Sequence, residues 1–455
     1  MELAAHIFRQ YDIRGIVGED LDAGVAEQVG RAYGAVLREI LGGNGSVVVG
    51  HDNRPSSPDL AEGLIRGLLS SGIDVLDVET VPTPLVFWAE KRFEADGGIQ
   101  ITGSHNPPEY NGIKMSMQGR SFYGDSIQEL EERIRAGRFL DGSGNRTGRE
   151  ILSTYVEELA SSFQLRRPVR AVVDCGNGAG SLVGIRLLEA IGADVLPLYC
   201  ESDGTFPNHH PDPTVDEYIQ DMIHMVKDEG AEVGIAFDGD ADRVGAVDEN
   251  GEIVRGDILL LLFGLDLLEK RGPGQELVFD VKCSQVLPEV FRKAGGEPVM
   301  WKTGHSHIKE KMKELDAPLG GELSGHMCFA DEYTGIDDAV YAACRLVDLL
   351  SRRQEPLSRL VAKLPTYVST PEIRIEVDEE KKWAVVEKAL EHFKKDHEVI
   401  DVDGARVLFG DGWGLLRTSN TQPVIVARYE ARTDERLKEI QSTMEDWLAT
   451  QGVHV

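Results

Sequence analysis

A serine, a histidine and a lysine share one stiff loop early in the chain, and together they could carry out group transfer. The loop reads Thr102-Gly103-Ser104-His105-Asn106-Pro107-Pro108-Glu109-Tyr110-Asn111-Gly112-Ile113-Lys114. Its Pro-Pro and Asn-Gly pairs are typical of tight turns, which would hold the Ser104 hydroxyl in place. A hydroxyl with polar neighbours and a nearby cation indicates chemistry here, whereas an isolated Ser-His pair would indicate only a surface turn.

Three aspartates at alternate positions, Asp238, Asp240 and Asp242, lie on a short loop between two apolar runs that we interpret as strands. Carboxylates with this spacing can converge on one hard cation, and without a cation or basic partners their repulsion is costly. An EF-hand does not fit, because Arg243 occupies the position that requires glycine and strands flank the loop. Since the loop supplies few ligands, Mg²⁺ fits better than a caged Ca²⁺, with water or phosphate oxygens completing the coordination.

A later loop, Gly320-Gly321-Glu322-Leu323-Ser324-Gly325-His326, combines a carboxylate, a hydroxyl and an imidazole between glycines. Glu322 and Ser324 are two positions apart, so an extended backbone points both side chains the same way, where they could bind vicinal sugar hydroxyls. Alone, the motif could equally be a turn with a capping serine. Upstream, His305 follows a glycine and is the better candidate for a site histidine, whereas we expect His307 to be structural.

The chain has 48 basic and 78 acidic residues, a formal net charge of −30. This charge argues against nucleic acids and anionic membranes as partners, and it would also repel an anionic substrate unless a local positive site exists. The loop from Arg417 to Pro423 offers such a site, because an arginine, hydroxyls and an amide on one turn can surround a phosphate. In isolation it could also be a polar hairpin. Its candidate ligands are Arg417, Ser419, Asn420 and Thr421.

The elements that must position these loops alternate between strand-like runs and amphipathic helical stretches. Helical spacing covers residues 25–41 and 59–70, and strand-like runs cover 46–49, 73–78 and 98–102. The pattern restarts at 170–174, followed by a helix at 181–191, and again at 277–281, followed by a helix at 285–295. The last section combines strands at 372–377, 405–417 and 424–430 with helices at 380–395 and 433–449. Such alternation predicts layered α/β units and a final α+β unit. We expect linkers at 140–145, 248–252 and 352–356.

The five cysteines, Cys175, Cys200, Cys283, Cys328 and Cys344, are scattered and form no CxxC pair. This argues against a disulfide framework or a structural zinc site and favours reduced thiols. No apolar run reaches the roughly 18–20 residues that cross a bilayer, and the N-terminus lacks the features of a signal peptide. We therefore expect a cytoplasmic protein with no membrane partner.

Taken together, these motifs resemble the α-D-phosphohexomutase superfamily, most of all its bacterial phosphomannomutase/phosphoglucomutase members. The likeness covers nearly the whole chain and begins at Phe8-Arg9-Gln10-Tyr11-Asp12-Ile13-Arg14-Gly15, followed in order by the serine, acidic, Gly320–His326 and Arg417–Pro423 loops. It implies an α/β fold in which three similar α/β domains with mixed sheets and a C-terminal α+β domain surround a central cleft. We predict that the domains carrying the phosphoserine, metal-binding, sugar-binding and phosphate-binding loops span residues 1–150, 151–252, 253–365 and 366–455.

The resemblance also implies a role for each candidate residue. Ser104 would carry a phosphoryl group in the active state and contribute to the metal site, where Mg²⁺ would be held by Asp238, Asp240 and Asp242. The reacting end would be lined by Arg14, Lys114, Arg243 and His305. The substrate would be bound by Tyr11, Lys282, Glu322, Ser324, His326, Arg417, Ser419, Asn420, Thr421 and Arg428.

The implied reaction converts hexose 1-phosphate to hexose 6-phosphate through a bound hexose 1,6-bisphosphate that reorients between two phosphoryl transfers. Lys114 is our first candidate for general acid/base, with His305 as the alternative. The sugar is expected to be mannose, glucose or both. Leu323 and the Ser419-Asn420-Thr421 run make glucosamine a weaker candidate. A metal-dependent phosphatase and a silent sugar-phosphate-binding protein are the competing hypotheses. We expect a monomer or a weak dimer.

Overall fold

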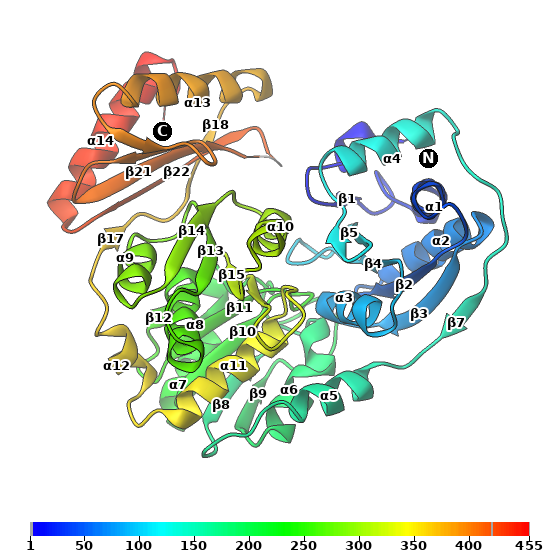
Figure 1. Ribbon diagram of the computed structural model, residues 1–455, viewed down its shortest axis with the longest axis horizontal. Helices are drawn as coiled ribbons and strands as arrows, with labels where there is room; N and C mark the ends of the chain where they lie inside the picture. The colour runs from blue at the N-terminus through cyan, green and yellow to red at the C-terminus, as the bar shows by residue number, and fades with distance from the viewer. Residues whose placement is uncertain (1–2, 420–421, 455) are drawn as a thin grey trace.

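The computed structural model describes residues 3–419 and 422–454 and folds them around four sheets, each with its own helices. In Figure 1 the first unit, blue to cyan, lies to one side, and the second and third units lie together in the middle. The fourth unit, orange to red, lies against the third. The predicted combination of three α/β units and one final α+β unit is confirmed. Among the described residues, no helix is both long and apolar enough to cross a membrane.

The first sheet has the order β1-β5-β4-β2-β3-β7, with β6 paired to β5. Its strands are β1 (Ile13–Ile16), β2 (Ser46–His51), β3 (Asp74–Thr80), β4 (Gly97–Ile101), β5 (Tyr110–Met117), β6 (Arg120–Ser121) and β7 (Arg146–Gly148). Its helices are α1 (Ala23–Leu41), α2 (Ser57–Ser70), α3 (Thr83–Arg92) and α4 (Asp125–Arg135). Strands β3, β2 and β4 run parallel, and β5 pairs antiparallel with β4.

The second and third sheets also combine a parallel core with an antiparallel neighbour, but have fewer strands. Their orders are β12-β11-β10-β8-β9 and β14-β13-β15-β16. The second unit contains α5 (Leu152–Ala160), β8 (Arg170–Asp174), α6 (Gly184–Ala190), β9 (Asp194–Leu198), α7 (Gln220–Glu229), β10 (Val233–Phe237), β11 (Val244–Asp248) and β12 (Ile253–Val254). The third contains α8 (Gly256–Arg271), β13 (Glu276–Asp280), α9 (Val286–Lys293), β14 (Glu297–Trp301), α10 (His305–Leu315), β15 (Leu319–Gly321), β16 (Met327–Phe329), α11 (Ala339–Arg352) and α12 (Leu357–Val361).

The fourth sheet is antiparallel and has the order β17-β22-β21-β20-β19, with β18 paired to β22. Its elements are β17 (Val368–Ser369), β18 (Ile373–Glu376), α13 (Glu379–Phe393), β19 (Glu398–Ile400), β20 (Ala405–Leu408), β21 (Gly412–Thr418), β22 (Val424–Ala431) and α14 (Asp434–Thr450). Figure 1 shows both helices on the same face of this sheet.

The four loops singled out from the sequence occupy equivalent places in the four sheets. Each loop joins two antiparallel neighbours: β4 to β5, β10 to β11, β15 to β16 and β21 to β22. In the first three sheets the strand before the loop also belongs to the parallel core of its sheet. A loop at such a junction leaves the end of a buried strand, so the sheet fixes where it begins and ends. The common placement supports the interpretation of the α/β units as structurally similar.

One apolar core runs through the first three units. It includes Trp88 of α3, Val173 of β8, Leu287 of α9 and Leu346 of α11, all buried. The fourth unit has a separate core and meets the third through a small cluster of Val281, Trp413 and Leu415. The units that carry the serine and acidic loops are therefore held together by continuous packing, which limits their relative movement.

Two sequence-based expectations differ from the structure. The stretch at 248–252 is not a linker: it is the turn of a hairpin, in which the Asp248 side chain accepts from the backbone N–H groups of Asn250 and Glu252 and β12 pairs with β11. The helix expected at 181–191 begins as a 3-10 turn, Ala179–Leu182, and becomes α-helical only at Gly184, since Val183, with a φ of −132° and a ψ of −28°, is not helical.

Candidate active site

Ser104 is the most constrained residue of the serine loop. Its backbone has a φ of +50°, a left-handed conformation that costs energy for a residue other than glycine. The side chain is buried, and its Oγ lies 3.1 Å from both Asp238 Oδ2 and His105 Nδ1. Burial and the nearby Arg243 and Arg14 hold the pKa of His105 well below its usual value, so the ring is neutral near pH 7. The serine hydroxyl is thus aimed at a carboxylate of another unit.

A buried arginine that sequence reasoning missed holds this loop in shape. Arg54, three residues after the end of β2, donates to the backbone carbonyls of Ser104, Asn106, Pro107 and Tyr110 at 2.6–3.1 Å. Its Nε also pairs with Asp52 at 3.2 Å. One planar guanidinium therefore satisfies four carbonyls of a turn that makes few internal bonds, which stabilises the strained serine conformation.

We expect Arg54→Lys to destabilise the protein by about 2–4 kcal/mol, because an ammonium cannot reach all four carbonyls and buried acceptors are left unpaired. Urea unfolding measures the loss, and amide hydrogen exchange at residues 103–111 should become faster. Arg66→Lys, on the exposed side of α2, is the matched control and should change stability by less than about 0.5 kcal/mol. Unchanged exchange in the serine loop would refute the role given to Arg54.

The acidic loop meets the serine loop by direct backbone contact. A Cβ placed on Gly239 would lie 2.4 Å from the carbonyl oxygen of Ser104, so only glycine permits this approach. Asp240 Oδ2 accepts from the hydroxyls of Thr83 and Thr102, at 2.6 and 3.2 Å. Asp238 Oδ1 accepts from the backbone N–H groups of Asp242 and Arg243, both at 3.1 Å. Hydrogen bonds from both units therefore fix the orientation of the carboxylates.

Lys114 lies between two of these aspartates. Its Nζ is 2.8 Å from Asp240 Oδ2 and 2.5 Å from Asp242 Oδ2. Burial opposes the charge of Lys114, but Asp240, Asp242 and Asp238 outweigh it and raise the pKa of the lysine. Burial acts to raise the pKa of Asp240, but Lys114 outweighs burial, and the pKa of Asp240 is lowered overall. The pKa of Asp238 is raised, by burial and by the two neighbouring aspartates. The lysine is therefore the cation that balances the acidic loop in this structure.

The donor set of the acidic loop fits a divalent cation. Asp238, Asp240 and Asp242 offer one oxygen each within 4.8 Å of one another. The Oδ1 atoms of Asp240 and Asp242 are buried without a hydrogen-bond partner among the described residues, which is costly unless a further positive group binds there. Three converging carboxylates, two of which keep an oxygen that accepts no hydrogen bond from the described residues, suit a hard cation such as Mg²⁺.

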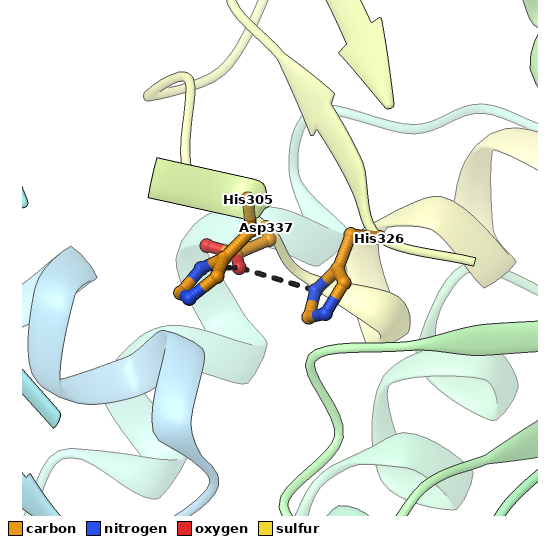
Figure 2. Close-up of side chains that lie close together, drawn as sticks. All are labelled: His305, His326 and Asp337. Atoms are coloured by element: carbon orange, nitrogen blue, oxygen red, sulfur yellow. Dashed lines mark hydrogen bonds and ion pairs between the residues drawn. The ribbon is translucent and has the colours of Figure 1, made fainter. Parts of the chain in front are cut away.

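A chain of polar contacts leads from Arg243 into the third unit. Arg243 Nε donates to His326 Nε2 at 2.9 Å, which leaves the ring proton on Nδ1, 3.2 Å from Asp337 Oδ2. The same carboxylate oxygen lies 2.7 Å from His305 Nδ1. Figure 2 shows both rings directed at Asp337, and they stack with centroids 5.0 Å apart. Burial lowers the pKa of His305, while Asp337 partly opposes that effect.

Asp337 is a second residue that the motifs did not reveal. It is buried and also accepts from Lys309 Nζ at 2.6 Å, so one carboxylate orients two predicted site histidines. The sequence gives little indication that Asp337 is a site residue, since it belongs to a polar stretch well after the Gly320–His326 loop. His307, expected to be structural, contacts Tyr11 and Tyr123 edge to face.

Thr303 and Gly304 join the first, third and fourth units. Tyr11 Oη donates to the Thr303 carbonyl at 2.9 Å, and the Thr303 N–H donates to Asp403 Oδ2 at 3.1 Å. Asp403 Oδ2 also accepts from Arg417 Nε at 2.9 Å. These bonds bring Tyr11 and Arg417 to the same segment, Thr303-Gly304. The Glu322 carboxylate accepts from the Gly304 N–H, and Ser324 Oγ lies 3.4 Å from Glu322 Oε2.

The Arg417–Pro423 loop is anchored by a lysine that was not foreseen. Lys382, buried on α13, donates to the carbonyls of Ser419 and Gln422 at 2.7 and 3.0 Å. The Gln422 N–H donates to Ser419 Oγ at 3.2 Å. Asn420 and Thr421, the other predicted phosphate ligands, lie outside the described residues.

Lys282 and Arg428 lie at the contact between the third and fourth units, and Arg14, on β1, contacts the serine loop. Lys282 Nζ pairs with Glu372 Oε1 at 2.6 Å, and Arg428 donates to the carbonyl of Lys282. Arg14 Nη1 donates to Asn106 Oδ1 at 2.6 Å. The structure therefore gathers Ser104, Lys114, the three aspartates, Arg243 and His326 directly, and among the described residues it links His305 to them through Asp337 and Arg14 to them through the serine loop.

Comparison with known proteins shows which family of proteins carries these four domains. Family models described as phosphoglucomutase/phosphomannomutase match four successive parts of the chain: alpha/beta/alpha domain I at residues 5–141, domain II at 153–251, domain III at 255–367 and the C-terminal domain at 372–446. Fold and site thus define an α-D-phosphohexomutase. More narrowly, the chain belongs to the phosphoglucomutase/phosphomannomutase family.

Relatives of this family cover almost the whole chain. A phosphomannomutase/phosphoglucomutase of Pseudomonas aeruginosa is 45% identical over 448 residues, which is 98% of this chain and 96% of that protein. A phosphoglucomutase of Neisseria gonorrhoeae is 43% identical over 441 residues, 96% of this chain and 95% of that one. The crystal structure of a phosphoglucomutase/phosphomannomutase family protein from Burkholderia thailandensis superposes with a TM-score of 0.92 at 43% identity, covering 98% of each chain.

Proposed function

We propose that the protein interconverts hexose 1-phosphate and hexose 6-phosphate, with mannose, glucose or both as the sugar. The observation that carries this proposal is the 3.1 Å approach of Ser104 Oγ to Asp238 Oδ2, because it sets a hydroxyl of one unit against the acidic loop of another. A serine in this position can carry a phosphoryl group. The negative charge of that group would be balanced by a cation bound to the acidic loop. The names of the P. aeruginosa and N. gonorrhoeae relatives support the same reaction.

Two phosphoryl transfers then account for the interconversion. In the first, the phosphorus–oxygen bond of phosphoserine 104 breaks and a new bond forms to the free O6 hydroxyl of hexose 1-phosphate, whose proton leaves to a base while Ser104 Oγ takes up a proton. The resulting hexose 1,6-bisphosphate reorients. The bond between phosphorus and O1 then breaks as a new bond forms to Ser104 Oγ, which loses its proton while O1 gains one, giving hexose 6-phosphate. Lys114 is our first candidate for the proton transfers and His305 the second. Arg243 and Arg14 would neutralise charge on the transferring group.

Asp238, Asp240 and Asp242 would hold Mg²⁺, with Ser104 as a neighbouring ligand. When bound, this ion would supply charge neutralisation at the phosphoryl group. Glu322 and Ser324 would bind sugar hydroxyls. The non-reacting phosphate would be held by Arg417 and Ser419, together with Asn420 and Thr421. We also assign substrate contacts to Tyr11, Lys282, His326 and Arg428.

The proposed function is tested by supplying mannose 1-phosphate, Mg²⁺ and a trace of glucose 1,6-bisphosphate as activator. We expect mannose 6-phosphate to accumulate with little free phosphate. Predominant release of free phosphate would instead establish a phosphatase, in which water attacks phosphoserine 104. Binding without either product would establish a silent sugar-phosphate-binding protein. Glucose 1-phosphate in a parallel reaction measures the sugar preference.

A further inference from the structure

Two cysteines of the second unit lie in direct contact, although 25 positions separate them in the sequence. Cys175 directly follows β8, and Cys200 lies two residues beyond the end of β9, its parallel neighbour. Their sulfur atoms are 2.8 Å apart, and both thiols are free. The Cys175 N–H donates to the carbonyl of Leu198 at 3.1 Å, so the sheet itself keeps the two side chains together.

The two thiols differ in environment. Cys175 is buried, whereas Cys200 is partly exposed, so a small reagent can reach Cys200 first. Burial and the neighbouring Cys200 raise the pKa of the Cys175 thiol, while the contact with Cys175 lowers that of Cys200. An accessible thiol with the lower pKa, next to a second thiol that can resolve it, is the usual arrangement of a redox-active pair.

We propose that Cys175 and Cys200 form a reversible disulfide, so that this pair is an oxidative modification site of the enzyme. The oxidant is a peroxide. The Cys200 thiolate attacks one peroxide oxygen, the O–O bond breaks, and the leaving hydroxide takes up a proton to become water. The Cys200 sulfenic acid is then attacked by the Cys175 sulfur, which loses its proton; the S–O bond breaks and a second water leaves. Overall, two thiols and one hydrogen peroxide yield one disulfide and two waters.

The turn that begins at Cys175 contacts the acidic loop and the segment that anchors the serine loop. The N–H of Ala179 donates to the Gly239 carbonyl at 2.9 Å, and a Cβ on Gly178 would lie 2.7 Å from that same oxygen. On its other side, Asn53 Nδ2, adjacent to Arg54, donates to the Asn177 carbonyl at 2.7 Å. A bond from Cys175 to Cys200 would therefore restrain a turn that supports the acidic loop and touches the segment anchoring the serine loop.

The test compares the full-length enzyme after treatment with hydrogen peroxide and after dithiothreitol. We expect peptide mapping to give a Cys175–Cys200 linked peptide and the thiol count in denaturant to fall by two from the five cysteines, with full recovery in dithiothreitol. The oxidised protein should also melt at a temperature higher by about 4 °C or more, because the new bond restricts the unfolded chain.

Matched variants separate the pair from the other cysteines. Cys200→Ser, at the partly exposed position, should abolish the linked peptide and the melting shift, whereas Cys344→Ala, in the core of α11, should keep both. Oxidation of Cys200 to a sulfinic acid without loss of the Cys175 thiol would overturn the proposal. A linked peptide with an unchanged melting temperature would overturn the inference that the bond stabilises the protein.

Discussion

Ser104→Ala is expected to lower kcat for the interconversion of mannose 1-phosphate by at least about 10³-fold, with no phosphoryl group detectable on the variant. The reason is that the proposed mechanism needs the Ser104 hydroxyl as phosphoryl carrier: Ser104 Oγ is held 3.1 Å from Asp238 by a loop whose carbonyls are fixed by Arg54. Steady-state kinetics with glucose 1,6-bisphosphate measures the loss, and intact-mass spectrometry of the wild type and the variant measures the phosphoryl group.

Two further variants make this result interpretable. Ser104→Gly should be just as inactive, although glycine relieves the left-handed strain, which separates loss of the hydroxyl from a change in backbone energy. Ser143→Ala, in an exposed stretch before β7, should keep wild-type kinetics. Substantial activity in Ser104→Gly would mean that another residue carries the phosphoryl group.

The parts of the site that could be predicted from sequence are those in which the reactive side chains and the turn that positions them lie close along the chain. The alternating aspartates at 238–242 needed only a tight turn between two strands, and β10 and β11 supply it. The serine loop could be predicted for the same reason, because its own prolines and glycines define the turn.

Two of the residues that were missed act across long sequence separations and bind backbone atoms. Arg54 contacts carbonyls some 50 positions away, and Lys382 anchors a loop about 40 positions later. Every residue has a backbone carbonyl, so the type of the accepting residue does not reveal which side chain will bind it. The Cys175–Cys200 contact depends likewise on the parallel pairing of β8 and β9, so the count and spacing of cysteines could not indicate it.

Lys114 illustrates a role that sequence could predict only in part. The family resemblance implied an acid/base role for this cation, ten residues after the serine, and that role stays a prediction. Its contact with Asp240 and Asp242 adds a second consequence, because the lysine balances charge that a divalent ion would otherwise balance. The stability of the protein and its response to Mg²⁺ should therefore be linked through this side chain.

Lys114→Met should lower the stability of the metal-free protein by about 3–5 kcal/mol, since it leaves buried carboxylates without their cation. The pKa of Asp240, now lowered by Lys114, would rise in the variant, so part of the loss would be recovered by proton uptake at low pH. Saturating Mg²⁺ should restore most of the stability while kcat stays about 10²–10⁴-fold below wild type, because the ion replaces the charge of the lysine but not its proton transfer.

Thermal or urea unfolding in EDTA and in Mg²⁺ measures both states, and Lys91→Met, at the exposed end of α3, serves as the matched control with a change below about 0.5 kcal/mol. Lys114→Arg, which keeps the charge, should retain more stability in EDTA than Lys114→Met. If Lys114→Met unfolded like the wild type in EDTA, the lysine would not be balancing the aspartates. If Mg²⁺ restored kcat as well as stability, Lys114 would have no part in proton transfer, and His305 would take its place as the candidate acid/base.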